Sequence, residues 1–461
     1  MSDVVISSAG EPDGASRIVS LDVLRGIAIL AILFMNINAM GASFWAAFVD
    51  PRHLGWTSLD QSVWYVRQVL ADGTARALLQ MLFGAGMVIL TDRAADAADD
   101  WPLMRRYYAR NLVLWAFGLV HALVLMWPGD ILHTYGIAAL IAFLFRRLTP
   151  VGLLLAGLSL ALVQLADGGS QYLGGMEQQA QVERAAAKGA AGAALAAPER
   201  ELLDQEARRS ERTGEPPAEL RELIAAEDRG RTTTSAAWFA TQWKVFLTIE
   251  GESFRFFGIS FQPFEMLLIW EAAATMLVGA ALYRWGVLQG LRSRRFYLLL
   301  TFASYAFGLP ARAIGAVEFL SLDGLPHLSA ATQELARLAT AIGHIGVVHL
   351  LLGSAVGSRL LRPFEAAGRT ALTIYFLQSI ICLWILYPPF ALGLYGQQGW
   401  ASLMATAFAI NAVLLAWANW WVRHYRIAPV EWAWRSLVER RVLPMRNRTA
   451  SSGTDRAPHP A

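Results

Sequence analysis

Long apolar stretches recur along the chain, and short polar or Arg-rich segments separate them. A helix that crosses about 30 Å of hydrocarbon needs roughly 20 mostly apolar residues. Ten stretches approach this requirement, some of them short: 23–45, 75–91, 111–127, 130–146, 150–166, 264–282, 296–317, 339–357, 370–391 and 401–421. The pattern therefore predicts an all-α fold, a polytopic transmembrane helical bundle of about ten spans.

The arginines between these stretches predict the orientation of the spans. Arginines cluster after spans two, four, six, eight and ten, whereas the short loops between spans three and four and between spans nine and ten contain none. Cytoplasmic loops carry the excess of Lys and Arg in membrane proteins. We therefore expect both ends of the chain in the cytoplasm.

One long segment, 167–262, breaks the alternation and carries most of the charge. Its part from Glu199 to Arg231 is dense in Glu, Arg and Ala and predicts two or three solvated helices. The following Trp- and Phe-rich stretch, Trp238–Phe257, is typical of a membrane interface. We expect this segment to be a periplasmic helical insertion. The remaining domains are 1–16, a disordered amino-terminal end; 17–166, spans one to five; 263–441, spans six to ten with a membrane-edge carboxyl-terminal segment; and 442–461, a disordered tail.

Composition supports a membrane protein and excludes a nucleic-acid binder. Of the 461 residues, 55% are hydrophobic and 16% are charged, against about 45–50% and 25% in soluble proteins. No basic tract is interleaved with aromatic residues as single-strand binders require. The single cysteine, Cys382, excludes an intrachain disulfide. The first apolar run is too long for a signal peptide. Composition predicts the lipid bilayer as the partner of this chain.

Ionisable groups inside spans are costly, and each is therefore a candidate functional residue. Arg25 opens the first span, and Asn36 follows eleven residues later, about 20° away around the helix. A polar group at each end of one stripe indicates a face that points into the bundle. The alternative for Arg25 is a cytoplasmic anchor whose charged head reaches back to water.

Histidines and a carboxylate lie in or beside the first, third and fourth spans. His121 lies in span three, and Asp130 and His133 share one helix face at the outer mouth of span four. An Asp that orients a His is a common device of general acid–base sites, although Asp130 after Pro-Gly is also a typical N-cap. His53, in the outer segment after span one, is either an exposed loop histidine or a second candidate base.

Glu271 in span six and Gln378 in span nine complete the set of intramembrane polar residues. Each is either a structural hydrogen-bonding group between helices or, like Asn36 and His121, a candidate substrate-binding residue. The sequence has no Walker loop, nucleophile elbow, HExxH or paired CxxC motif. We therefore expect no metal site and no tightly bound cofactor, and any chemistry must come from residues that converge across helices.

Five segments together resemble a known family. They are SLDVLRGIAILAILFMNI at Ser20–Ile37, LLQMLFGAGM at Leu78–Met87, HALVLMWPGDILHTYGI at His121–Ile137, AAGRTALTIYFLQS at Ala366–Ser379 and RIAPVEWAWRSL at Arg426–Leu437. In this order they resemble the YeiB-like family of bacterial inner-membrane proteins, a domain of unknown function. The resemblance covers about residues 17–441 and implies a multi-pass protein of the bacterial inner membrane.

The opening LDVLRGIAI…N is also similar, more distantly, to the heparan-α-glucosaminide N-acetyltransferase family, which joins the acyltransferase-3 enzymes in a transmembrane acyltransferase superfamily. This resemblance implies transfer of an acyl group from cytoplasmic acyl-CoA to a cell-envelope glycan or lipid acceptor. HLGW at His53–Trp56 stands where that family has its catalytic histidine, and the Asp130–His133 pair is the other candidate base. Arg25 or Arg369 would meet the phosphates of the donor.

Two other functions remain open from the sequence. A transporter or permease would use the interior charged groups as a substrate path, although neither a repeat of one half in the other nor a pair of broken helices is evident. A non-catalytic scaffold would bind a partner through the insertion. The sequence does not decide between a monomer and a homodimer.

Overall fold

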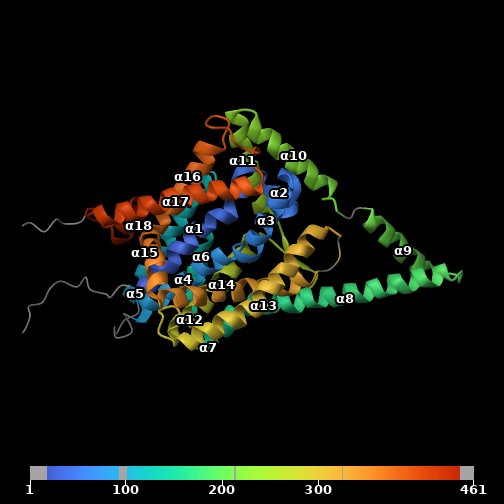
Figure 1. The fold of residues 1–461 in the computed structure, drawn as a ribbon, viewed down its shortest axis with the longest axis horizontal. Coiled ribbons are helices and arrows are strands. Elements are labelled where there is room, and N and C mark those ends of the chain that lie inside the picture. Colours follow the sequence, from blue (N-terminus) through green and yellow to red (C-terminus); the bar gives the residue numbers. More distant parts are fainter. Residues whose placement is uncertain (1–17, 93–100, 212–213, 324, 326, 447–461) are drawn as a thin grey trace, which may run out of the picture.

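The computed structural model describes residues 18–92, 101–211, 214–323, 325 and 327–446, and this part of the chain is almost entirely helical (Figure 1). The predictions for residues 1–16 and 447–461 lie outside the described residues. The first half contains α1 (Val19–Gly41), α2 (Phe44–Val49), η1 (Pro51–Leu54), α3 (Ser58–Leu70), α4 (Thr74–Asp92), α5 (Trp101–Leu123), α6 (Leu132–Leu144), α7 (Pro150–Gly157), α8 (Ser159–Ala190), α9 (Ala197–Ser210), α10 (Ala218–Thr232) and α11 (Ser235–Gly251). The second half contains β1 (Phe254–Phe256), β2 (Ile259–Phe261), α12 (Glu265–Arg284), α13 (Arg294–Ser321), α14 (Leu328–Leu352), α15 (Ala355–Arg369), α16 (Ala371–Ile380), the π-helix η2 (Ile381–Leu386), α17 (Trp400–His424) and α18 (Pro429–Glu439).

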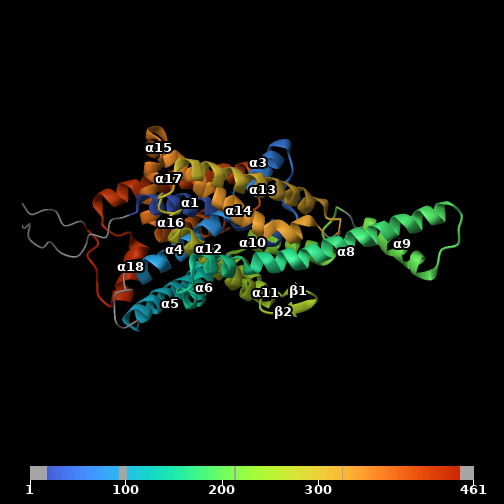
Figure 2. The same ribbon diagram turned by 90° about the horizontal axis from the view of Figure 1, so that it is seen from below.

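The helices form a bundle around α1. Helices α4, α15, α16 and α17 contact α1, while α12 packs against α4, α6 and α7. Both ends of the described chain lie at one end of the molecule together with α5 and α18, which we call the arginine end (Figure 1). Helices α8 and α9 project beyond the bundle at the opposite, insertion end (Figure 2). This arrangement agrees with the predicted topology, in which both termini lie on one side of the membrane and the insertion on the other.

Two glycines allow α1 and α15 to cross closely. A Cβ at Gly26 would overlap the carbonyl oxygen of Phe364, and a Cβ at Gly368 would overlap the carbonyl oxygen of Asp22. Small residues permit this close approach of backbones in membrane bundles. The crossing joins two of the segments that carry the family resemblance, the LRG segment of α1 and the AAGRT segment at the end of α15.

The structure has fewer long apolar helices than the ten predicted spans. Seven helices among the described residues are long and apolar enough to cross a membrane, or eight if α15 and the α16–η2 helix, bent by 79° to each other, count as one span. Helix α6 is apolar but has only 13 residues, about 20 Å at 1.5 Å per residue. Helix α5 carries Arg105, Arg106 and Arg110 in its first half. Helix α6 is therefore short for a span, whereas α5, with 23 residues, is long enough but carries charges in its first half.

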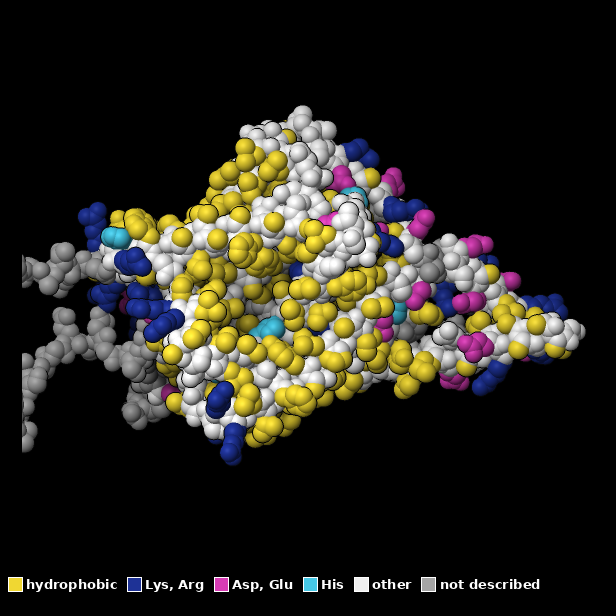
Figure 3. Space-filling view, in the orientation of Figure 1, with side chains coloured by type: hydrophobic (Ala, Val, Ile, Leu, Met, Phe, Trp, Pro, Cys, Tyr) yellow, Lys and Arg dark blue, Asp and Glu magenta, His cyan; other side chains and the backbone are white. Residues whose placement is uncertain are grey.

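The surface distinguishes the membrane part from the two ends. Apolar side chains cover the middle of the molecule, basic side chains gather at the arginine end, and charges of both signs cover the insertion end (Figure 3). Helix α13 shows the lipid-facing character most clearly, because only a small part of its apolar segment is buried. Its exposed side chains include Leu298, Leu299, Phe302, Ile314 and Val317. The protein is therefore a multi-pass integral membrane protein.

Carboxylates from other elements cap four helices at their first turns. The first N–H groups of a helix have no partner within it, and a carboxylate there also meets the positive end of the helix dipole. Glu431 accepts hydrogen bonds at the start of α16, Asp60 at the start of α17, Glu227 at the start of α2 and Glu318 at the start of α14. The contacts of Glu431, Asp60 and Glu227 fix the relative positions of elements that are far apart in sequence, and the contact of Glu318 joins the consecutive helices α13 and α14.

The insertion begins within a continuous helix. The boundary expected at residue 167 falls inside α8, which has 32 residues and continues from the membrane part into the projecting arm.

The rest of the insertion returns to the bundle through α10, where Glu227 and Arg231 form an ion pair with both side chains 1% exposed. The guanidinium also lies over the ring of Tyr395, 5.3 Å from its centroid. The insertion is thereby fixed to the outer end of the bundle.

The carboxyl-terminal segment 442–446, predicted to be disordered, is bound to α18 in the structure. Trp432 donates its indole N–H to the carbonyl oxygen of Leu443, 2.7 Å away, and the backbone N–H of Arg426 donates to Met445. The side chains of the segment did not reveal these contacts, because its backbone carbonyl groups accept them.

Candidate functional site

A cavity of about 210 Å³ lies between α1, α4, α5, α6, α16 and α18. Its wall includes Arg25 of α1 and Arg369 at the end of α15, the two residues expected to meet donor phosphates. Arg110 and Arg435, which were not predicted, belong to the same wall, as does the buried Tyr375 of α16. The rest of the wall is mainly apolar: Ile29, Leu79, Leu82, Phe83, Met87, Leu90, Leu114, Ile131 and Leu132.

Glu431 of the PVEW segment positions α16 along this cavity. Its carboxylate accepts hydrogen bonds from the backbone N–H of Leu372, 2.7 Å away, and from the backbone N–H and hydroxyl of Thr373. Burial raises the pKa of Glu431, and these hydrogen bonds oppose the shift. The GRTALT and PVEW segments therefore form one structural unit, a helix and its remote cap, which holds Tyr375 at the cavity wall.

Asp130 lies next to this cavity and joins two histidines. Its Oδ1 lies 2.8 Å from Nδ1 of His121, and its Oδ2 lies 2.8 Å from Nδ1 of His133. The hydroxyl of Tyr375 donates to Oδ1 over 3.2 Å, and the ring of Tyr375 stacks on His121 at 4.4 Å between centroids. The predicted Asp130–His133 pair is therefore part of a larger group. Its aspartate, expected at the outer mouth of span four, has a side chain with no exposed surface.

The backbone that carries Asp130 is unusual in two respects. Met126, in the turn after α5, has φ of 61°, a left-handed conformation that is uncommon for a residue with a long side chain. Gly118 of α5 faces the first turn of α6, where a Cβ would overlap the backbone nitrogen of His133. Strained turns of this kind persist where the surrounding structure determines them, often at functional sites.

Further polar groups extend the cluster at both ends. Nε2 of His121 lies 2.9 Å from the hydroxyl of Ser379, and Nε2 of His133 lies 3.4 Å from Oε1 of Glu265. The same Glu265 oxygen accepts a hydrogen bond of 2.8 Å from the hydroxyl of Thr134. Acids and histidines thus alternate from α16 through α5 and α6 to α12. Such an arrangement can hold or move a proton without placing one isolated charge in the apolar interior.

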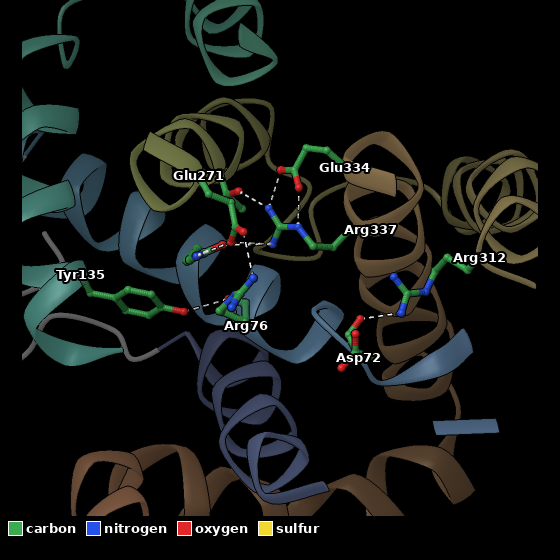
Figure 4. A network of polar contacts seen from close by, with 9 residues as sticks. Asp72, Arg76, Tyr135, Glu271, Arg312, Glu334 and Arg337 are labelled. Atoms are coloured by element: carbon green, nitrogen blue, oxygen red, sulfur yellow. Dashed lines mark hydrogen bonds and ion pairs between the residues drawn. The ribbon is translucent and has the colours of Figure 1, made fainter. Parts of the chain in front are cut away.

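Glu271, a predicted substrate-binding residue, is paired in a separate network (Figure 4). Its carboxylate lies 2.8 Å from Arg76 and 3.5 Å from Arg337, and Arg337 also pairs with Glu334. The two arginines and two glutamates balance in charge across α4, α12 and α14. Tyr135 links this network to the cavity wall by donating to the carbonyl oxygen of Arg76, 3.2 Å away.

His53 is not part of the cavity. Its Nε2 lies 2.7 Å from Oδ2 of Asp228 on α10, and the other carboxylate oxygen accepts a hydrogen bond of 2.9 Å from Tyr395. The hydrogen bond to Asp228 raises the pKa of His53, and partial burial opposes the shift. The histidine side chain is 31% exposed. The structure therefore places this candidate base at the junction between the bundle and the insertion.

The remaining predicted residues make contacts within the bundle. Gln378 donates to the carbonyl oxygen of Ile29 and to the side chain of Asn411, each over 3.2 Å, and thereby links α16, α1 and α17. Asn36 is half-buried in α1 and is not part of the wall of the 210 Å³ cavity. In the part of the chain that the structure describes, no group of three or more His, Cys, Asp or Glu side chains could hold a metal ion.

Sequence reasoning missed Tyr375, which connects the cavity to Asp130. A signal was present, because Tyr375 and Ser379 are one turn apart in the segment that resembles the family and both contact the Asp130 cluster. Sequence alone did not show which helix faces this stripe, since Asp130 and Tyr375 are 245 residues apart.

Comparisons with known proteins support the resemblance seen in the sequence. Residues 282–441 match a family model described as a protein of unknown function, DUF418. The uncharacterized protein YeiB of Escherichia coli is 29% identical over 444 residues, which cover 94% of this chain and 99% of the relative. The uncharacterized protein YxaH of Bacillus subtilis is 26% identical over 437 residues, covering 91% and 94%. The matched domain runs from the end of α12 through α18 and contains Arg369, Tyr375 and Glu431. The chain is therefore similar to the YeiB-like proteins over most of its length, and its residues 282–441 match the DUF418 model.

Proposed function

We propose that this protein is a membrane-bound acyltransferase of the bacterial inner membrane. One observation carries the proposal: a single cavity is lined by Arg25 and Arg369 and also by Tyr375, whose hydroxyl contacts Asp130. Groups suited to an anionic donor and groups suited to proton transfer thus lie along one space. Ionisable residues inside a membrane bundle are usually retained for function.

The donor in this proposal is a short acyl-CoA. Arginine is suited to phosphate because its planar guanidinium forms paired, charge-assisted hydrogen bonds. The apolar middle of the cavity, with Leu79, Leu82 and Met87, suits a narrow and mostly uncharged arm that carries the thioester. The phosphates would lie at the arginine end and the thioester near Tyr375.

In the chemical step, the oxygen or nitrogen of an acceptor attacks the thioester carbonyl. The acceptor loses its proton to the Tyr375 hydroxyl while that hydroxyl passes its own proton to the Asp130–His133 pair. The C–S bond then breaks, the sulfur leaves as a thiolate and takes up the proton, and the products are the acylated acceptor and free CoA. Asp130 orients the imidazole and stabilises its charged form, as in other acid–base pairs. The acceptor is a cell-envelope glycan or a lipid headgroup.

Binding and transfer by the purified protein test this proposal. We expect acetyl-CoA to bind, Arg25→Ala and Arg369→Ala to weaken binding, and His133→Gln to leave binding intact while stopping transfer of radiolabelled acetate to envelope membranes. His53→Gln, which alters a histidine outside the cavity, should retain transfer. Absence of binding at millimolar acetyl-CoA would overturn the proposal.

A proton-coupled transporter is the second candidate, and the balanced Glu271–Arg76–Arg337–Glu334 network favours it. Interior ion pairs of this kind mark ion paths in many transporters. In proteoliposomes with a pH-sensitive dye inside, a transporter predicts proton movement that Glu271→Gln abolishes. An acyltransferase predicts no such movement.

A further inference from the structure

A second and larger hollow lies at the arginine end, outside the cavity described above. Its volume is about 850 Å³, and α5, α18 and the carboxyl-terminal segment 442–446 form its walls. We call it the arginine basin. Among the described residues that line it are six exposed arginines, Arg106, Arg110, Arg426, Arg435, Arg441 and Arg446, and one carboxylate, that of Glu439. Glu439 pairs with Arg106 at 2.6 Å. The described lining of the basin is therefore predominantly basic.

The walls of the basin are fixed by specific contacts. Trp434 of α18 donates its indole N–H to the carbonyl oxygen of Arg110 on α5, 3.1 Å away, and the Arg110 guanidinium lies 4.6 Å from the Trp434 ring centroid. The segment 442–446 is held by its backbone, since Leu443 accepts from Trp432 and donates to Ser436. These contacts fix the position of the segment through backbone atoms of Leu443 and Met445.

The basin and the inner cavity share part of their walls. Arg110, Trp434 and Arg435 line both. The wide, basic arginine basin therefore adjoins the narrower and mostly apolar inner cavity. A ligand that fits both must have a bulky anionic head and a slender arm with little charge.

We propose that the arginine basin binds a phosphate-bearing head group whose arm enters the inner cavity. Two sources have this chemistry: a soluble nucleotide thioester such as acyl-CoA, and a membrane lipid with an anionic phosphate head. The inference goes beyond the proposed function, because head-group binding at the basin does not require that any acyl group is transferred. Arginine, with its forked donors, is the side chain best suited to recognise phosphate oxygens from several directions.

The test compares two double variants that remove the same charge from the same end of the molecule. Arg441→Ala with Arg446→Ala alters the basin, and Arg294→Ala with Arg295→Ala, at the exposed start of α13, is the matched control. Three probes are used: CoA; adenosine 3′,5′-bisphosphate, which has the head without the arm; and phosphatidylglycerol in nanodiscs compared with phosphatidylcholine. Ligand-induced shifts of the unfolding temperature and direct titration report binding.

We expect the basin variant to weaken binding about tenfold or more, since two charge-assisted contacts are lost, while the control binds like the unchanged protein. If CoA and the bisphosphate lose affinity, with CoA the tighter ligand, the head group is a nucleotide. If only binding of phosphatidylglycerol is lost, the head group is a lipid phosphate. Equal effects on binding in both double variants, or no effect in either, would overturn the proposal that the basin binds the head group. If ligands bind at the basin but the protein transfers no acyl group, the proposed acyltransferase function is wrong and the basin proposal stands.

Discussion

Two histidine–aspartate pairs lie in different regions of the molecule and have different surroundings. Asp130 has no exposed side-chain surface, contacts two histidines and a tyrosine, and adjoins the cavity that Arg25 and Arg369 line. His53 pairs with Asp228 at the outer junction, where both side chains are about one-third exposed. The first pair joins bundle helices to each other, whereas the second joins the bundle to its insertion.

The difference shows that a His–Asp contact is not by itself a site. The contact of His53 is short, at 2.7 Å, but the hollow beside it has a volume of only about 10 Å³, room for about one water molecule at most. The Asp130 cluster adjoins a cavity of about 210 Å³. For the proposed acyltransferase we therefore expect the Asp130 cluster to take part in the reaction and the His53–Asp228 contact to hold the insertion.

The largest expected effect concerns the attachment of the insertion. Arg231→Met leaves the carboxylate of Glu227 buried without its partner, and loss of one member of a buried ion pair costs about 3–5 kcal/mol. We expect α10 to become sensitive to protease at temperatures where the unchanged protein resists, with acetyl-CoA binding retained. Arg229→Met, an exposed residue on the same helix, is the control. Loss of acetyl-CoA binding in Arg231→Met would show that the two regions are coupled.

The next effect separates the two aspartates in catalysis. Asp130→Asn preserves size but removes the charge that orients the imidazole, and we expect transfer to fall by about a hundredfold, the lower range for a general acid–base group. Asp228→Asn should change transfer by less than a few-fold. Transfer rates, measured with the unfolding temperature of each variant, check this. A similar loss in both variants would abolish the distinction.

A smaller effect is expected from the cap that holds α16 in place. Glu431→Ala removes the acceptor at the first turn of α16, and loss of a helix cap costs about 0.5–2 kcal/mol. Glu431→Gln keeps one acceptor oxygen and should lose less. Acetyl-CoA binding should weaken in the same order because Tyr375 lies on this helix. Unchanged binding and unfolding temperature in Glu431→Ala would show that the cap does not position α16.

The smallest effect is a pH dependence at His53. The pKa of His53 is raised above its ordinary 6.5 by the hydrogen bond to Asp228. The resulting stabilisation is fully present below pH 6.5 and is lost as the pH rises through the raised pKa. For a partly exposed pair we expect about 0.2–1 kcal/mol. Protease resistance of α10 should therefore fall slightly from pH 6 to pH 9, and His53→Gln should remove that change.

The sequence predicted the class of fold because helix formation and membrane insertion depend on local apolarity. Runs such as 264–282 and 401–421 became α12 and α17 nearly within the expected limits. The alternation of arginines predicted that both termini lie at one end. Local signals failed for α8, where a polar composition after residue 167 concealed a continuous helix, because exposed polar residues are compatible with helix outside the membrane.

The sequence also determined which residues were candidates: Asp130 and His133 one turn apart, and arginines at the ends of spans. Only the tertiary structure decided which candidates meet. His121 and Tyr375 join Asp130, the latter across 245 residues, and Asp228 joins His53 across 175. The physical reason is that periodicity specifies which face of a helix is apolar, while the partner of that face is chosen by packing. That packing is set by close crossings, such as that of Gly26 with the backbone of Phe364, and by remote caps, such as Glu431 at the start of α16. The same contacts determine the shape of the cavity.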